Sequence, residues 1–181
     1  MGQTIIDHFY KDNRDLIGYL KLKGEISYQS DVEDHFRKTL LLSTASYFEA
    51  NLKEILIDFF QERTNRSEIL VRFIQNKAIE RQYHTFFSWQ EKNANAFFGL
   101  FGDGFKGFMK TEVKGDSKLD ESIKAFLKLG DSRNALVHEN FATFPLESSA
   151  EEIYELYKQA SFFIETLPVK LREYAERENA P

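Results

Sequence analysis

The sequence contains no cysteine among its 181 residues, which excludes disulfide frameworks, thiolate zinc sites and cysteine nucleophiles. Proline and glycine are scarce, with 3 and 9 residues, so few positions interrupt regular secondary structure. No apolar run approaches the ~18 residues that a membrane-spanning helix needs, and the N-terminal residues are too polar for a secretory signal. We therefore expect a cytoplasmic protein without a membrane partner.

The charge balance also differs from that of a protein that coats nucleic acid with a uniformly basic surface. The chain has 24 Lys and Arg against 29 Asp and Glu, a formal net charge of −5. This excludes a uniformly basic surface but leaves room for a local basic patch. Apolar residues make up 42% of the sequence, and 18 residues are Phe. Few helix breakers and many large apolar rings indicate a globular protein built from long packed helices.

Apolar residues recur every three or four positions along two long stretches, as they do on one face of an α-helix. This spacing predicts long helices over about residues 31–62 and 149–177. Alternation with a period of two is absent, so we expect no sheet. The sequence also shows no internal repeat and no convincing linker. The resulting interpretation is an all-α helical bundle that forms a single domain over residues 1–181.

Local signals predict where individual helices begin and end. Ser-x-x-Glu sequences at Ser30, Ser88 and Ser149 are typical of capping boxes, in which the serine and glutamate side chains satisfy free backbone donors. Gly130 is predicted to end one helix, with a short separate element after it. Residues 99–107 hold four of the nine glycines and are predicted to form a loop.

The segment RNALVH, residues 133–138, places a cation, an amide and an imidazole close together in the chain. On a helix, Asn134 and His138 are four residues apart and share a face. Arg133 and His138 are five apart and lie ~140° apart around the helix axis. The long arginine side chain can bend toward the same pocket, or the segments of two subunits can meet.

These groups suit cleavage of a phosphodiester bond in RNA. An imidazole with a pKa of ~6.5 can take a proton from the ribose 2′-hydroxyl or give one to the departing 5′-oxygen. A guanidinium can bind two phosphate oxygens of the crowded intermediate. Because the 2′-hydroxyl is the nucleophile, no metal or other cofactor is required. Without further context, a polar turn of helix with His138 packed or solvated is the simpler explanation of the spacing.

The surrounding sequence adds that context. RNALVH matches the Arg-x4–6-His motif of the HEPN superfamily, including an Asn directly after the Arg. LLSTASYFEANLKEIL resembles the long helix that packs beside the motif in this superfamily. LGDSRNALVHENF followed by EEIYELYKQASFFIETL resembles its motif and final helix. The chain thus resembles HEPN proteins over about residues 31–175, the expected core of a HEPN-like bundle, with no subfamily assigned.

The resemblance implies a function and a set of site residues. Many HEPN domains are metal-independent endoribonucleases that dimerise around a composite cleft, and they occur as toxins and anti-phage effectors. On this basis Arg133 binds the scissile phosphate, Asn134 orients the site and His138 transfers protons. Glu49 is the candidate for an additional acidic residue from the long helix, although an exposed helix position explains it equally well.

The same resemblance implies partners, and it leaves an alternative open. An RNA substrate, a homodimer and an antitoxin or other regulatory partner are expected. Some HEPN domains lack nuclease activity, so the alternative is a catalytically inactive helical module that binds a protein or a nucleic acid.

A local basic segment offers a place for RNA to bind. Residues 63–114 contain nine Lys and Arg against five Asp and Glu, and affinity that rests on such cations falls with salt. We assign RNA contacts to three of the cations: Arg72, Lys77 and Arg81. Four aromatic residues of this segment can either stack on bases or belong to the core: Tyr83, Phe86, Phe87 and Trp89.

Overall fold

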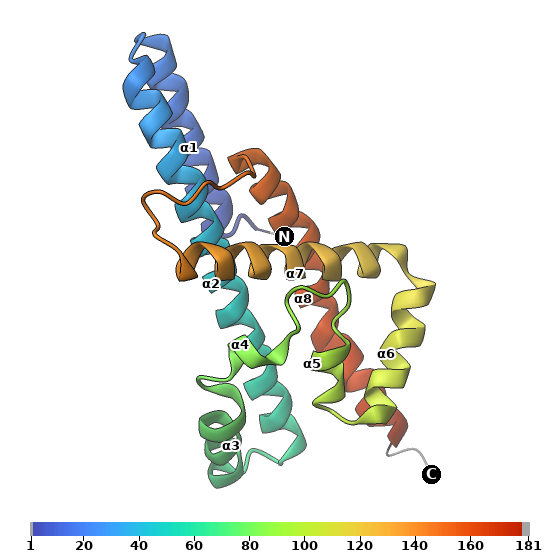
Figure 1. The fold of residues 1–181 in the computed structure, drawn as a ribbon. Helices are drawn as coiled ribbons and strands as arrows, with labels where there is room; N and C mark the ends of the chain where they lie inside the picture. The colour runs from blue at the N-terminus through green and yellow to red at the C-terminus, as the bar shows by residue number, and fades with distance from the viewer. Residues whose placement is uncertain (1, 179–181) are drawn as a thin grey trace. The chain divides into compact units, whose positions relative to one another are not determined.

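The computed structural model describes residues 2–178, and the regular secondary structure in this range is helical throughout. The elements, labelled in part in Figure 1, are α1 (Ile5–Leu22), α2 (Ile26–Arg63), α3 (Glu68–Ile74), the π-helix η1 (Gln75–Ile79), α4 (Tyr83–Phe86), α5 (Asn95–Gly99), α6 (Asp103–Gly115), α7 (Ser117–His138) and α8 (Ala150–Glu178). The described residues include no strand, which confirms the predicted all-α fold. Over the same range, no helix combines the length and the apolar character needed to cross a membrane.

The two predicted long helices are present as α2 and α8. Their periodic apolar faces produce buried side chains along both helices, including Leu40 and Leu52 in α2 and Ile153 and Leu167 in α8. Helix α8 continues through Pro168. Burial of a repeated apolar face is the main source of helix stability in proteins, which is why the spacing located these helices well.

The chain divides into two compact units. The first consists of Met1–Tyr47 and Leu129–Lys158, and the second of Phe48–Lys128 and Gln159–Pro181. Helices α2, α7 and α8 each contribute a segment to both units. That the chain forms one domain stays a prediction.

In the first unit, helix α1 is tied to α8 by hydrogen bonds at its N-terminus. Thr4 and Asp7 form a capping box, and the Thr4 hydroxyl lies 2.6 Å from the Tyr157 hydroxyl. The Tyr154 hydroxyl donates to Asp7 over 2.7 Å, and its ring stacks on Tyr10 with centroids 3.9 Å apart. Burial, followed by the hydrogen bond to Asp7, raises the pKa of Tyr154 to about 12. The phenol therefore stays a neutral donor at physiological pH.

Helix α1 also packs against the first part of α2, as Figure 1 shows. The rings of Phe9 and Phe36 meet edge to face at 5.7 Å. Gly24, with φ of +74°, makes the turn between the two helices, and α2 then begins at Ile26. The predicted start at Ser30 is therefore wrong: Ser30 lies inside α2, and its predicted partner Glu33 accepts a hydrogen bond from Gln29 instead.

The second unit has a core built largely of phenylalanine. Phe97 lies at its centre, with its ring 4.8 Å from that of Phe87 and 5.5 Å from that of Phe101. The fully buried side chains of this unit include Phe48, Phe97, Phe98, Phe105, Phe126 and Phe163. The high phenylalanine content of the sequence is explained by this cluster, in which edge-to-face and tilted rings fill the space between helices.

Three further local predictions differ from the structure and one agrees. Helix α7 passes through Gly130 instead of ending there, because burial of its leucines outweighs the cost of a glycine inside a helix, ~1 kcal/mol. Residues 99–107 are mostly helical, as the end of α5 and the start of α6. Ser88 lies in a turn and starts no helix. The capping box at Ser149 is confirmed, with bonds of 2.9 and 3.1 Å to Glu152.

A close approach in the second unit makes glycine necessary at one position of α6. A Cβ atom at Gly104 would lie 2.0 Å from the Tyr174 hydroxyl oxygen, and the tyrosine ring is held between Phe105 and Phe108. We expect Gly104→Ala to lower the free energy of unfolding by about 1–3 kcal/mol through overpacking, measured by urea denaturation. Gly107→Ala in the same helix meets nothing within 4 Å and should stabilise the protein. Equal effects of the two substitutions would contradict this account.

Candidate functional site

The three residues of the Arg-x4-His segment lie on the last two turns of α7, within the first unit. Arg133 and Asn134 are half-buried, whereas His138 is exposed and is the final residue of the helix. Leu136 is buried and holds in the core the side of the helix that lies opposite Asn134 and His138. The structure therefore brings the three residues together on one rigid element, with the polar side chains at its surface.

Asn134 contacts the cation rather than the imidazole. The Arg133 Nη1 group donates a hydrogen bond to Asn134 Oδ1 over 3.1 Å. We expected the amide to orient the site, and the structure indicates that the group it holds is the guanidinium. Within residues 2–178 no carboxylate pairs with Arg133, so its charge is available to an anion.

His138 is open to solvent. Its imidazole makes no hydrogen bond to another residue in the described part of the chain. A ring sealed in the core could not exchange protons with a substrate, and this ring is reachable. The position thus meets the first geometric condition for a group that transfers protons.

Glu49 belongs to the second unit, whereas the Arg-x4-His segment belongs to the first. Its carboxylate binds Lys53 one turn along α2, with 2.7 Å between Glu49 Oε1 and Lys53 Nζ. Lys53 also lies 3.9 Å from Glu80. The simpler of the two sequence interpretations, a partly exposed helix position, accounts for these contacts. Its predicted role at the active site stays a prediction.

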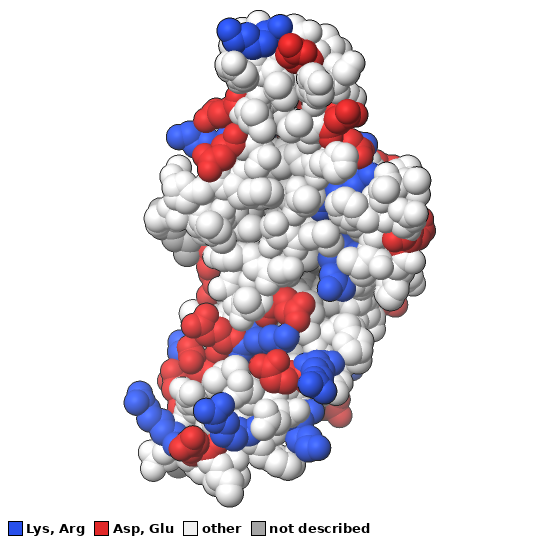
Figure 2. Space-filling view, turned by 90° about the vertical axis from the view of Figure 1, so that its left-hand side faces the viewer, with Lys and Arg blue, Asp and Glu red and all other residues white. Residues whose placement is uncertain are grey.

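The three cations assigned to RNA binding are all exposed, in or near α3 and η1 of the second unit. Arg72 has a long ion pair of 3.9 Å with Glu68, and no carboxylate in the described residues pairs with Lys77 or Arg81. On the face drawn in Figure 2, Lys and Arg are interspersed with Asp and Glu instead of forming a continuous basic stripe. Any RNA contact here would involve separate cations, not a broad basic surface.

Most of the nearby aromatic surface is not available for stacking on bases. Phe86 and Phe87 are buried at 5% and 4% exposure and belong to the core. Tyr83 and Trp89 are half-buried, with their rings 5.5 Å apart, and the Trp89 indole donates to the His84 carbonyl oxygen. These two rings are the ones that retain some accessible area.

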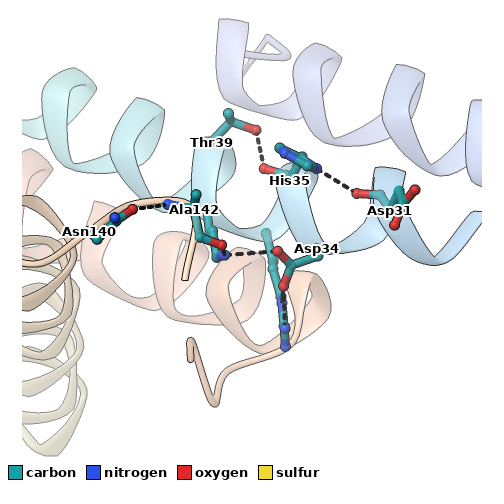
Figure 3. A network of polar contacts seen from close by, with 8 residues as sticks. Asp31, Asp34, His35, Thr39, Asn140 and Ala142 are labelled. Atoms are coloured by element: carbon teal, nitrogen blue, oxygen red, sulfur yellow. Dashed lines mark hydrogen bonds and ion pairs between the residues drawn. The ribbon is translucent and has the colours of Figure 1, made fainter. Parts of the chain in front are cut away.

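A polar network that the sequence analysis did not identify lies on α2 in the first unit (Figure 3). Asp34 accepts a hydrogen bond of 2.8 Å from Lys38 and one of 2.6 Å from Arg37. These bonds, that from Lys38 first, hold the pKa of Asp34 below its usual value of 3.8. Lys38 is only 2% exposed. The four-residue spacing of Asp34 and Lys38 was the available sequence signal.

A cavity of about 590 Å³ lies beside this network, between α1, α2 and the start of α8. The two guanidinium groups that line it are already neutralised, Arg14 by Glu151 and Arg37 by Asp34. It therefore offers no unpaired arginine to an anion. Within residues 2–178, no three histidine or carboxylate side chains gather as metal ligands.

The comparison with protein families agrees with this arrangement. A family model described as RiboL-PSP-HEPN matches residues 7–172. The chain belongs to the RiboL-PSP-HEPN family. The resemblance to HEPN proteins is thereby confirmed, and the match begins earlier than the predicted core, so that it includes nearly all of α1. No curated protein and no solved structure matches the chain.

Membership of the RiboL-PSP-HEPN family is compatible with ribonuclease activity. The all-α fold and the position of the Arg-x4-His segment before the final long helix fit that family assignment.

The Asp34 network makes the stability of this RiboL-PSP-HEPN protein depend on pH. Because the pKa of Asp34 is lower in the folded than in the unfolded state, its contribution is present above pH ~4 and is lost as the pH falls through the folded-state pKa. Asp34→Asn should lower the free energy of unfolding near neutral pH by about 1–3 kcal/mol, because the buried ammonium group of Lys38 loses its carboxylate partner. The difference from wild type should disappear in acid, as urea denaturation at several pH values would show.

Asp31→Asn is the matched control, because the Asp31 side chain makes no hydrogen bond to Arg37 or Lys38. A difference between wild type and Asp34→Asn that stays constant into acid would reject the electrostatic explanation.

Proposed function

We propose that this protein is a metal-independent endoribonuclease that acts as a homodimer, in the role of a toxin or anti-phage effector. The observation that carries the proposal is the end of α7. There, an exposed imidazole stands on the last two turns of one helix with a guanidinium to which no carboxylate of residues 2–178 is paired, in a chain of the RiboL-PSP-HEPN family.

In the proposed reaction, the His138 imidazole takes the proton of a ribose 2′-hydroxyl. The 2′-oxygen then attacks the adjacent phosphorus, and the bond from phosphorus to the 5′-oxygen breaks. Arg133 neutralises charge on the phosphate oxygens as the five-coordinate intermediate forms. Its guanidinium is held by Asn134, so less motion is lost when the phosphate binds.

The departing 5′-oxygen must receive a proton, and one imidazole cannot be base and acid in the same step. In a dimer, the imidazole of a second copy, in its protonated form, can supply this proton. The products are a 2′,3′-cyclic phosphate and a 5′-hydroxyl. DNA has no 2′-hydroxyl and should resist.

RNA cleavage in the presence of EDTA tests the proposal. Wild-type protein should cut RNA and leave 2′,3′-cyclic phosphate ends, whereas His138→Ala and Arg133→Ala should lose activity by about 100-fold or more. His35→Ala is the matched control, since His35 is also an exposed histidine on a helix of the first unit. Undiminished cleavage by His138→Ala would reject the assigned base, and cleavage of an all-deoxy strand would reject the nucleophile.

The composite cleft predicts a dimer in solution. Sedimentation should give a mass near twice 21.2 kDa. Because the mechanism needs an imidazole from each copy, mixed dimers with His138→Ala should be inactive, and an excess of His138→Ala should lower the activity of the wild type. A strict monomer at high concentration that still cleaves RNA would remove the second imidazole from the mechanism.

A second candidate function is a helical module that binds a partner, with or without catalysis. It is favoured by the apolar side chains exposed around the α1–α2 turn, since exposed patches of this kind commonly mark binding surfaces. Leu22 is 88% exposed, Ile26 65% and Tyr28 64%. An antitoxin or other regulatory protein is the expected partner. Inability of the wild type to cleave RNA, together with tight binding of a partner, would favour this candidate.

A further inference from the structure

Lys38 is a buried cation for which the proposed reaction has no direct use. It lies on α2 between the buried residues Phe36 and Leu40 and is itself 2% exposed. Lysines are almost never fully buried unless they are paired, because removing an ammonium group from water is costly. A leucine or methionine would fill this helix position without that cost. The contacts of the ammonium group therefore indicate what it does.

Two of its three contacts lie outside α2, in the segment that follows α7. The Lys38 Nζ group donates to Asp34 Oδ2 at 2.8 Å and to the Ala142 carbonyl oxygen at 3.4 Å (Figure 3). It also lies over the Phe141 ring, 5.7 Å from the centroid. Lys38 thus joins α2 to a backbone carbonyl more than 100 residues later in the chain.

The segment that Lys38 holds is a turn with its own hydrogen bonds. The Asn140 carbonyl oxygen accepts from the amides of Thr143 and Phe144 at 3.1 and 2.9 Å. The Asn140 side chain accepts from the Ala142 amide at 3.0 Å. Ala142 is therefore held on both sides, its N–H by Asn140 and its C=O by Lys38. A fixed turn of this kind transmits a constraint to the helix before it.

That helix ends at His138. The last carbonyl groups of a helix lack partners within the helix, and helix ends fray unless something restrains them. His138 is the final residue of α7, and the clamped carbonyl of Ala142 lies four residues later. We propose that Lys38 is a positioning residue: by clamping the 139–144 turn to α2, it fixes the end of α7 and the imidazole of His138. This inference rests on the proposed function.

Replacement of Lys38 isolates the clamp well. Without Lys38, the half-buried Asp34 carboxylate keeps its 2.6 Å bond to Arg37. Lys38→Met therefore removes the link to Ala142 and Phe141 together with the 2.8 Å bond to Asp34. Methionine fills similar volume and removes the charge.

The test combines kinetics with hydrogen exchange on the full chain. For RNA cleavage, Lys38→Met should lower kcat by about 10-fold or more, because small misplacement of a catalytic group is costly, and should leave KM within about twofold. Amide exchange over residues 135–144 should accelerate by about 10-fold. Lys38→Arg should restore part of kcat, because a guanidinium can also bridge the two acceptors. A role limited to stability would move the melting temperature without this pattern.

Lys124→Met is the matched control. Lys124 forms the same type of pair, four residues after Asp120 and at 2.6 Å, on α7 itself, but its side chain is 47% exposed and bridges to no turn. Its removal should leave kcat and the exchange rates unchanged. Asn140→Ala provides a second variant if Lys38→Met fails to fold. It removes the other restraint on Ala142 from an exposed position and should change kcat and exchange in the same direction.

The outcomes separate this inference from the proposed function. Unchanged exchange over residues 135–144 in both Lys38→Met and Asn140→Ala would overturn the clamp, whether or not the wild type cleaves RNA. Faster exchange with unchanged kcat would overturn the positioning role. If the wild type does not cleave RNA, the proposed function is rejected, and with it any role of the clamp in cleavage. Faster exchange in the variants would then show that the clamp exists as a structural restraint alone.

Discussion

The continuity of helix α7 is the constraint on which the candidate site depends. Twenty-two residues form one helix through Gly130, so that Arg133, Asn134 and His138 stand on an element anchored along its length. A separate helix over the last turns alone would be only marginally stable, because forming the first turn of any helix loses more free energy in backbone entropy than its hydrogen bond returns. Burial of Leu129 and Leu136 provides the stability that the helix loses through the glycine at position 130. The spacing of the Arg133 cation and the His138 imidazole is therefore set by apolar packing of the helix that carries them.

The sequence predicted the long helices because their apolar faces are read directly from residue spacing, but the boundaries depend on context. Ser149 caps a helix because the residues before it are not helical. Ser30 carries the same local pattern, yet the turn at Gly24 starts the helix four residues earlier. The burial of Lys38 could not be predicted at all, because it depends on a turn that reaches α2 from more than 100 residues away. Local signals describe what a residue can do, and distant contacts decide whether it does so.

In the predicted site, too, residue spacing predicted the local geometry but not the contacts between side chains. Spacing placed Asn134 and His138 on one helix face, which the helix confirms, but it did not predict that the amide oxygen binds Arg133. Glu49 was chosen as a carboxylate among apolar neighbours, and its ion pair with Lys53 explains why a charge is tolerated there. To act on a substrate, Glu49 would first have to give up that cation. The bonds already present around a residue thus bear on its role as strongly as its chemical type.

The distribution of accessible groups bears on how RNA could be recognised. Phe86 and Phe87 are core residues, so stacking could involve little more than the partly accessible Tyr83 and Trp89. The exposed cations, by contrast, can bind phosphates of any sequence. Binding through phosphates positions a strand but does not read its bases, so selectivity among RNAs would have to come from strand shape or from a partner. A nuclease that recognises RNA in this way would be harmful unless controlled. The exposed apolar side chains near Leu22 and Tyr28 offer a place, distinct from the Arg-x4-His segment, where a controlling protein could bind.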